Sequence, residues 1–173
     1  MTARGDLVQT VLSCLETALT ERPNTPGEIC LRVGTVPFSI GLNEDLCCEG
    51  LAWARVVSAA PTVTFPSEIE TVAPCRAYSI AVTVEMGVAR CMPDHGAESG
   101  ASCEEWTAVF LQVEEDAAAM QQAFCCALDT LKSDPLARFT ELALPGAWAP
   151  IDSQGGCIGG TMQATFGIDC TEC

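Results

Sequence analysis

The sequence has few basic residues and a single histidine. Its 173 residues include eight lysines and arginines against 23 aspartates and glutamates, which gives a formal net charge of −15. Proteins that bind nucleic acid neutralise phosphates with lysine and arginine, so this balance disfavours binding to DNA or RNA. It does not exclude a position near DNA, because a channel with acidic walls lets a polyanion pass without holding it.

Long hydrophobic runs, repeats and low-complexity tracts are also missing. No run approaches the roughly 20 apolar residues that span a bilayer, so we expect no membrane segment. The stretch Met1 to Asp6 is not a charged region followed by a continuous apolar one. We therefore expect a protein that is made, and at first kept, in the cytoplasm. With 49 % apolar residues, the chain suits a single globular domain over 1–173.

Cysteine, in contrast, is abundant. Twelve cysteines are spread along the chain, and only Cys170-x-x-Cys173 has the spacing of a zinc-ligand pair, so no metal site is expected. The others suit either small buried side chains or disulfides, the latter if the mature protein is exposed to an oxidising environment. Cys91 and Cys103 flank one loop and are a candidate disulfide pair.

The most regular pattern is an alternation between Cys75 and Cys91. One set of positions is apolar: Tyr78, Ile80, Val82, Val84, Met86 and Val88. The alternate set is small or polar: Ala77, Ser79, Ala81, Thr83, Glu85 and Ala89. A period of two predicts a long strand with one buried face.

Two amphipathic helices are expected, over residues 4–21 and 102–132. The second begins with Ser102-Cys103-Glu104-Glu105, which matches a capping box. Its length of about 45 Å predicts a kink near Glu114 to Asp116.

Four residues of the second helix lie off its apolar stripe: Ala118, Ala119, Gln122 and Cys126. They would allow another element to approach closely, or they cover a solvated face.

The remaining elements are short strands over 28–33 and 51–59 and a C-terminal hairpin of 147–151 and 157–168. Between them, prolines at 61, 66 and 74 predict an extended arm or loop over 59–75 rather than a central strand. The fold class is therefore α+β, with a mixed, mainly antiparallel sheet, two amphipathic helices packed on one face and a C-terminal β-hairpin.

Candidate catalytic chemistry is sparse. The one histidine, His95, lies in a loop with Asp94 and Glu98, where a solvated side chain is the usual outcome. No cysteine has a basic neighbour that would activate it as a nucleophile. We expect no enzyme activity and no cofactor.

Three stretches carry a resemblance to a known family. They are Cys47-Cys48-Glu49-Gly50-Leu51-Ala52-Trp53, Tyr78 to Val88 followed by Arg90-Cys91, and Trp148 to Gly160 with Gln154-Gly155-Gly156-Cys157. With the order of elements over most of the chain, they resemble the tail terminator proteins of long-tailed bacteriophages, more specifically those of phages of actinobacteria. The abundance of cysteine departs from the general pattern of that family.

The resemblance implies a structural virion protein, assembled in the host cytoplasm and located at the junction of tail and neck. Its ring, expected to be hexameric, would end the tail tube, contact the major tail tube protein and the neck or connector proteins, and let DNA pass without specific binding. On this hypothesis Arg55, Glu85, Ala118, Ala119 and Gln122 lie at a subunit contact or along the lumen. A head-closure or adaptor protein of the neck is the alternative within this class, and a small cytosolic cysteine-rich binding or redox protein is the alternative outside it.

Overall fold

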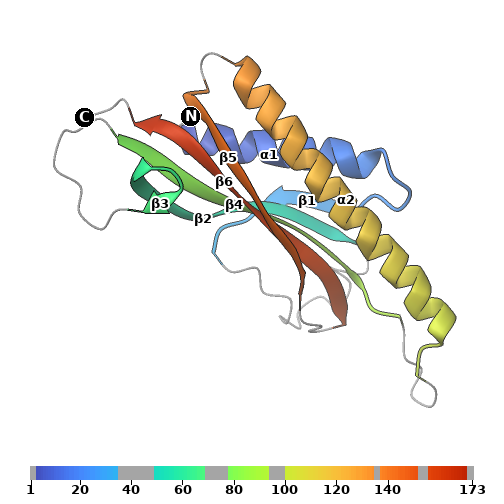
Figure 1. Cartoon of the computed structure of the whole chain (residues 1–173). Helices are drawn as coiled ribbons and strands as arrows, with labels where there is room; N and C mark the ends of the chain where they lie inside the picture. Colours follow the sequence, from blue (N-terminus) through green and yellow to red (C-terminus); the bar gives the residue numbers. More distant parts are fainter. Residues whose placement is uncertain are drawn as a thin grey trace.

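The computed structural model describes residues 3–34, 49–68, 78–93, 100–134, 137–151 and 156–170 (Figure 1). Their elements are, in chain order, α1 (Ala3–Thr20), β1 (Glu28–Leu31), β2 (Leu51–Thr64), β3 (Ser67–Glu68), β4 (Tyr78–Cys91), α2 (Cys103–Ser133), β5 (Phe139–Pro150) and β6 (Cys157–Cys170). The α+β class is confirmed.

The strands form one mixed sheet in the order β1-β2-β4-β6-β5, and β3 folds back onto the end of β2. Only the edge strand β1 runs parallel to its neighbour; the pairs β2–β4, β4–β6 and β5–β6 are antiparallel. The expectation of a mainly antiparallel sheet is therefore confirmed. Its centre consists of three strands of 14 residues each, β2, β4 and β6.

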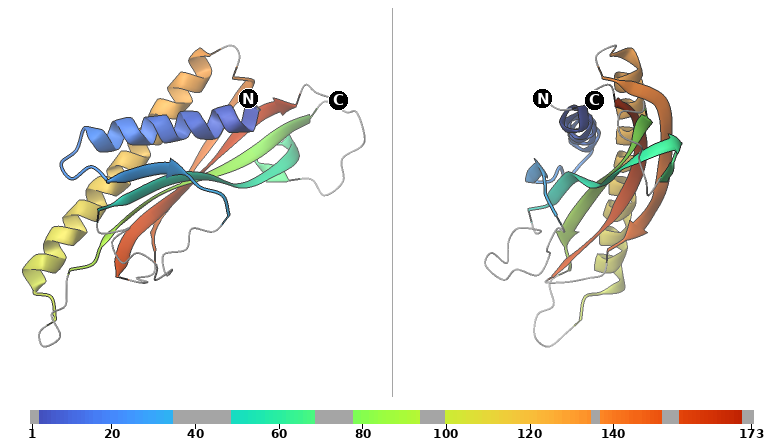
Figure 2. Two further views of the ribbon diagram at one scale, coloured as in Figure 1. Left: turned by 180° about the vertical axis from the view of Figure 1, so that it is seen from behind. Right: turned by 90° about the vertical axis from the view of Figure 1, so that its left-hand side faces the viewer.

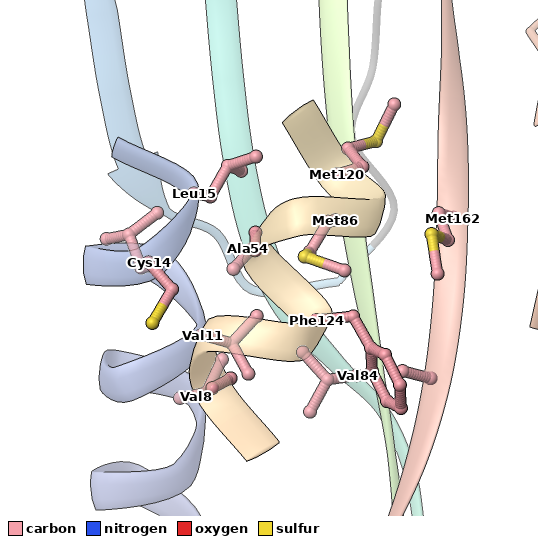
Figure 3. Packing of buried hydrophobic residues seen from close by; sticks show 14 of the residues in the cluster. Val8, Val11, Cys14, Leu15, Ala54, Val84, Met86, Met120, Phe124 and Met162 are labelled. Atoms are coloured by element: carbon pink, nitrogen blue, oxygen red, sulfur yellow. The ribbon is translucent and has the colours of Figure 1, made fainter. Parts of the chain in front are cut away.

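The main core lies between this sheet and the two helices. Buried residues of α1 and α2 form one cluster with alternate residues of the three central strands. The close-up in Figure 3 labels members from each element: Val8, Val11, Cys14 and Leu15 of α1, Met120 and Phe124 of α2, and Ala54, Val84, Met86 and Met162 of the sheet. The apolar positions of the predicted alternation from Val82 to Val88 are all in this core.

The opposite face of the sheet is also covered in its centre, which corrects the expectation of one buried face. Leu51, Trp53, Ala89 and Cys157 form a second buried cluster there. The indole ring of Trp53 lies against Gly87, where an added Cβ would come within 2.1 Å of the ring. The small residues of this face therefore make room for a large aromatic side chain.

Two boundaries differ from the expectation. Strand β2 continues through residues 59–64, the first part of the segment expected as an arm or loop. Pro61 pairs with Ile80 where β2 has no β1 partner on its other side, and an edge position tolerates the missing N–H. Residues 69–75 lie outside the described part. Strand β5 begins at Phe139 rather than near 147, with Pro145 on the outer edge of the sheet.

At the C-terminus, β5 and β6 pair in antiparallel fashion, while the expected hairpin turn at 152–155 lies outside the described residues. Helix α2 is continuous through residues 114–116, where a kink was expected, and it begins with the predicted capping box.

Candidate functional site

A polar cluster lies on the sheet face away from the helices, where two of the candidate residues meet. Arg55 of β2 is directly opposite Glu85 of β4, and its guanidinium donates to both carboxylate oxygens, from Nε to Oε1 at 2.6 Å and from Nη2 to Oε2 at 3.0 Å. Trp53 donates to Oε1 at 3.3 Å, and Gln163 of β6 donates to Oε2 at 3.4 Å. These donors come from β2 and β6, the two strands that flank β4.

The electrostatics of Glu85 follow from these contacts. Burial alone would raise the pKa of its carboxyl group, but the hydrogen bonds from Arg55, Trp53 and Gln163 and the charge of Arg55 outweigh burial, so the pKa is lowered. The hydrogen bond to Glu85 correspondingly raises the pKa of Arg55. The carboxylate is thus held in its charged form.

The cluster is closed rather than open to substrate. The side chains of Glu85 and Arg55 are 8 % and 17 % exposed, and the remaining Arg55 donor, Nη1, bonds to the carbonyl oxygen of Gly34. In the single chain, Glu85 is therefore a buried carboxylate paired with a partly buried guanidinium, not a free charge facing a lumen. A contact of this cluster with a neighbouring subunit stays a prediction.

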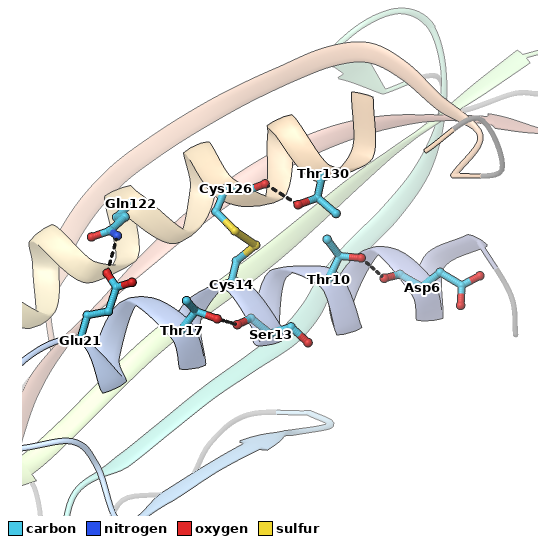
Figure 4. Close-up of a disulfide and its surroundings, with 9 residues drawn as sticks. All are labelled: Asp6, Thr10, Ser13, Cys14, Thr17, Glu21, Gln122, Cys126 and Thr130. Atoms are coloured by element: carbon cyan, nitrogen blue, oxygen red, sulfur yellow. Dashed lines mark hydrogen bonds between the residues drawn. A yellow bond between two sulfur atoms is a disulfide. The ribbon is translucent and has the colours of Figure 1, made fainter. Parts of the chain in front are cut away.

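The candidate residues of α2 lie on two different surfaces. Ala119 is fully buried, Ala118 is exposed, and exposed Gln122 bonds to the end of α1 through Glu21 at 3.2 Å and Arg22 at 3.1 Å (Figure 4). The element that approaches this side of α2 is thus α1 of the same chain.

A disulfide reinforces that helix pair. Cys14 of α1 is bonded to Cys126 of α2, with a Cα–Cα distance of 5.8 Å, in the centre of Figure 4. The adjoining groove between the helices is lined by Gln9, Thr10, Ser13, Cys14, Thr17 and Thr130. None of these residues supplies a carboxylate, an imidazole or a free thiol for catalysis.

The other cysteines correct the expected pairing. Cys91 belongs to a disulfide, but Cys103 is a free, exposed thiol, so the Cys91–Cys103 bond is not formed. Cys103 begins α2, in a first turn that is exposed to solvent. Cys157 is also in a disulfide, whereas Cys30 and Cys125 are free. Burial raises the pKa of the Cys30 thiol, which makes it a poorer nucleophile.

The sequence analysis missed another ion pair, a buried one, between Arg90 of β4 and Asp116 of α2. Their side chains are 7 % and 5 % exposed. Asp116 is the first buried residue of α2, so the pair marks the point where the helix meets the sheet. The signal available in the sequence was Asp116 itself, an acidic residue beside the apolar stripe of the helix, which indicates a buried partner of opposite charge.

Before that point, α2 presents large apolar side chains to solvent. Trp106, Phe110 and Leu111 are 41 %, 60 % and 57 % exposed, and none of residues 103–115 is buried. The sequence showed one apolar stripe along the whole helix, but not that the sheet covers only its second half.

Metal and membrane sites receive no support from the described residues. Within them, no group of three or more histidine, cysteine, aspartate or glutamate side chains could hold a metal ion. Among the helices of that same part of the chain, none is long and apolar enough to cross a membrane. Asp94, His95 and Glu98 lie outside the described ranges.

Comparison with models of known protein families gave no match to this chain, and comparison with curated proteins gave no significant similarity.

Proposed function

We propose that this chain is a structural subunit that self-associates into a ring, and that the ring is the tail terminator of a long-tailed bacteriophage. In this role it ends the tail tube and joins it to the head-to-tail connector, with a lumen through which DNA passes. Six copies are expected from the family resemblance. The phage assignment rests on that resemblance, and self-association rests on the surface of the molecule.

The observation that carries self-association is the exposed apolar half of α2. Three large apolar side chains, those of Trp106, Phe110 and Leu111, are each more than 40 % exposed on one short helical segment. Contiguous exposed apolar surface is typical of sites that bind another protein. A structural role also agrees with the two ion pairs, one buried and one partly buried, because their charged groups bind one another within the chain.

The net charge suits such a ring. Each copy carries −15, so an assembled lumen would repel the DNA that moves through it. The same charge makes copies repel one another, and apolar contacts must therefore supply the attraction between them.

The disulfides suit a protein that ends in an extracellular particle, since virion surfaces are among the oxidising locations where disulfides persist. The same disulfides would also suit a small cysteine-rich redox protein, which therefore stays the alternative. However, the sulfurs of Cys14 and Cys126 adjoin no catalytic acid or base in the groove beside them, which favours a structural use of this disulfide.

Deletion of the gene in a phage that carries it tests the function. A tail tube without its terminator should continue to polymerise, so electron micrographs of lysates should show tubes of unregulated length and heads without tails. A plasmid copy of the gene should restore tails of uniform length that are attached to heads.

The same experiment separates the alternatives. Tails of normal length that fail to join heads would indicate a head-closure or adaptor protein instead. Normal, infectious particles lacking this protein would contradict a structural role in the virion altogether.

A further inference from the structure

The helix layer and the sheet are offset from one another. At one end of the molecule, the first half of α2 projects away from the sheet (Figure 1). At the other end, β2, β3 and β4 extend beyond the N-terminal end of α1, which both Figure 1 and the left view of Figure 2 show. One end of the molecule therefore has a helix without a sheet, and the other has a sheet without a helix.

The exposed helix surface continues a buried one. Phe110, Ala117, Phe124 and Leu131 are spaced by seven residues and so lie nearly above one another on one face of α2. Ala117, Phe124 and Leu131 are at most 8 % exposed, and Phe124 and Leu131 pack in the helix–sheet core, whereas Phe110 is 60 % exposed. The face of α2 that packs on the sheet thus runs on, uncovered, toward the start of the helix.

The exposed sheet surface belongs to the face that helices cover elsewhere. Ala59 is opposite Val82, and Pro61 is opposite Ile80; both partners pack in the helix–sheet core. Ala59 on this face is exposed. Val63, beside an irregularity in the β2–β3 pairing between Thr62 and Thr64, is 72 % exposed at the same end of the sheet. The core face of the sheet therefore continues past the last helix that covers it.

We propose that the two surfaces bind each other between copies: residues 103–115 of α2 lie across the β2–β4 end of the next subunit. This inference rests on the proposed self-association and names its contact. The occupant is a second copy because the chain itself supplies both halves of a helix-on-sheet interface of the kind that already forms its core. Because the two surfaces are different and lie at opposite ends, the contact is head to tail and repeats until a ring closes.

The charges of the segment predict how the contact responds to salt. Glu104, Glu105, Glu114 and Glu115 are all exposed beside its apolar face, and the segment has no basic residue. Copies therefore attract one another through apolar area against a repulsive field, which salt screens. Association should strengthen as sodium chloride rises from 0.05 to about 0.5 M.

Two single substitutions test the contact from its two sides. Phe110→Asp places a carboxylate in the apolar helix surface, and Val63→Asp places one in the sheet surface. Each should weaken association by about 100-fold or more, because the new carboxylate is desolvated in the interface. The matched control is Leu144→Asp, which changes an apolar residue of 45 % exposure on the edge strand β5 and should associate like the parent protein.

A mixture of the two variants gives the sharpest readout. Phe110→Asp keeps an intact sheet end, and Val63→Asp keeps an intact helix, so one good contact remains between them. Light scattering should find each variant monomeric alone and a dimer when they are mixed in equal amounts. Circular dichroism and thermal unfolding must match the parent; Leu111→Asp and Ala59→Asp replace any variant that fails this check.

The outcomes are distinguishable. If the parent associates and both variants still do, or if the mixture stays monomeric, this contact is wrong while the ring itself stands. If Leu144→Asp alone loses association, the contact between copies involves β5 and the proposed contact is wrong. If the parent never associates, even with tail tubes, the proposed function fails as well.

Discussion

Arg90 and Asp116 form a buried ion pair with two hydrogen bonds, which joins the end of strand β4 to the middle of helix α2. The guanidinium of Arg90 donates from Nε to Oδ2 at 2.9 Å and from Nη2 to Oδ1 at 2.7 Å. The pair lies where α2 first becomes buried, so it fixes the base from which residues 103–115 project. The geometry of the proposed contact therefore depends on it.

We expect Asp116→Asn to lower the free energy of unfolding by about 3–5 kcal/mol, because it leaves the buried Arg90 charge without its partner. Replacing both residues, with Arg90→Met and Asp116→Leu, should recover most of that loss. Urea denaturation at pH 7 measures both effects. The control is Glu28→Gln, in an ion pair whose side chains are 47 % and 38 % exposed, which should cost at most about 0.5 kcal/mol. A similar small cost for Asp116→Asn would show that the pair is open in solution.

Glu85 predicts a dependence of stability on pH. Its pKa is lowered in the folded chain, so its contribution is fully present above the ordinary value of about 4.5 and is lost as the pH falls through the folded value. Glu85→Gln should therefore be less stable than the parent at pH 7, by about 2–4 kcal/mol. The difference should shrink steadily below pH 4.5.

Urea midpoints measured between pH 7 and pH 3 follow this difference. A gap between parent and Glu85→Gln that stays constant over that range would mean that the carboxylate titrates as it does in the unfolded chain. A gap that widens on acidification would reverse the sign of the predicted shift.

The disulfide between the helices predicts a loss of stability on its removal. Cys14 and Cys126 are 112 residues apart, and a link across so long a segment restricts the unfolded chain strongly. Replacing both by alanine should lower the free energy of unfolding by about 2–4 kcal/mol in the absence of reductant. The exposed free thiol of Cys103 provides the control, since Cys103→Ala should leave the urea midpoint unchanged. Equal midpoints for all three proteins would show that the Cys14–Cys126 bond does not form.

The local patterns of the sequence predicted the local structure well. The alternation before Cys91 predicted β4, and Ser102 with Glu105 predicted the capped start of α2. What failed depended on contacts between distant segments. Glu85 is buried because Arg55 and Trp53 reach it from the neighbouring strand, and no pattern within β4 reveals those partners.

The candidate site shows the same limit. Cys14 pairs with Cys126 because of the way α1 packs against α2, and this packing cannot be predicted from the sequence of either helix alone. Likewise, the apolar stripe of α2 was visible, but whether the sheet reaches Phe110 depends on the register of the whole fold. The part of that stripe that the sheet leaves uncovered, within residues 103–115, is the basis of the proposed contact between copies.

The central claim is that copies of this chain assemble into a ring with a lumen. The mass of the purified protein in solution tests this claim most directly. Light scattering over a range of concentrations and in about 0.5 M salt should find a particle of several subunits, six times the 18.2 kDa of one chain if the ring is hexameric, and negative-stain images should show an annulus. A particle of 18.2 kDa at every concentration, both alone and in the presence of tail tubes, would contradict the account.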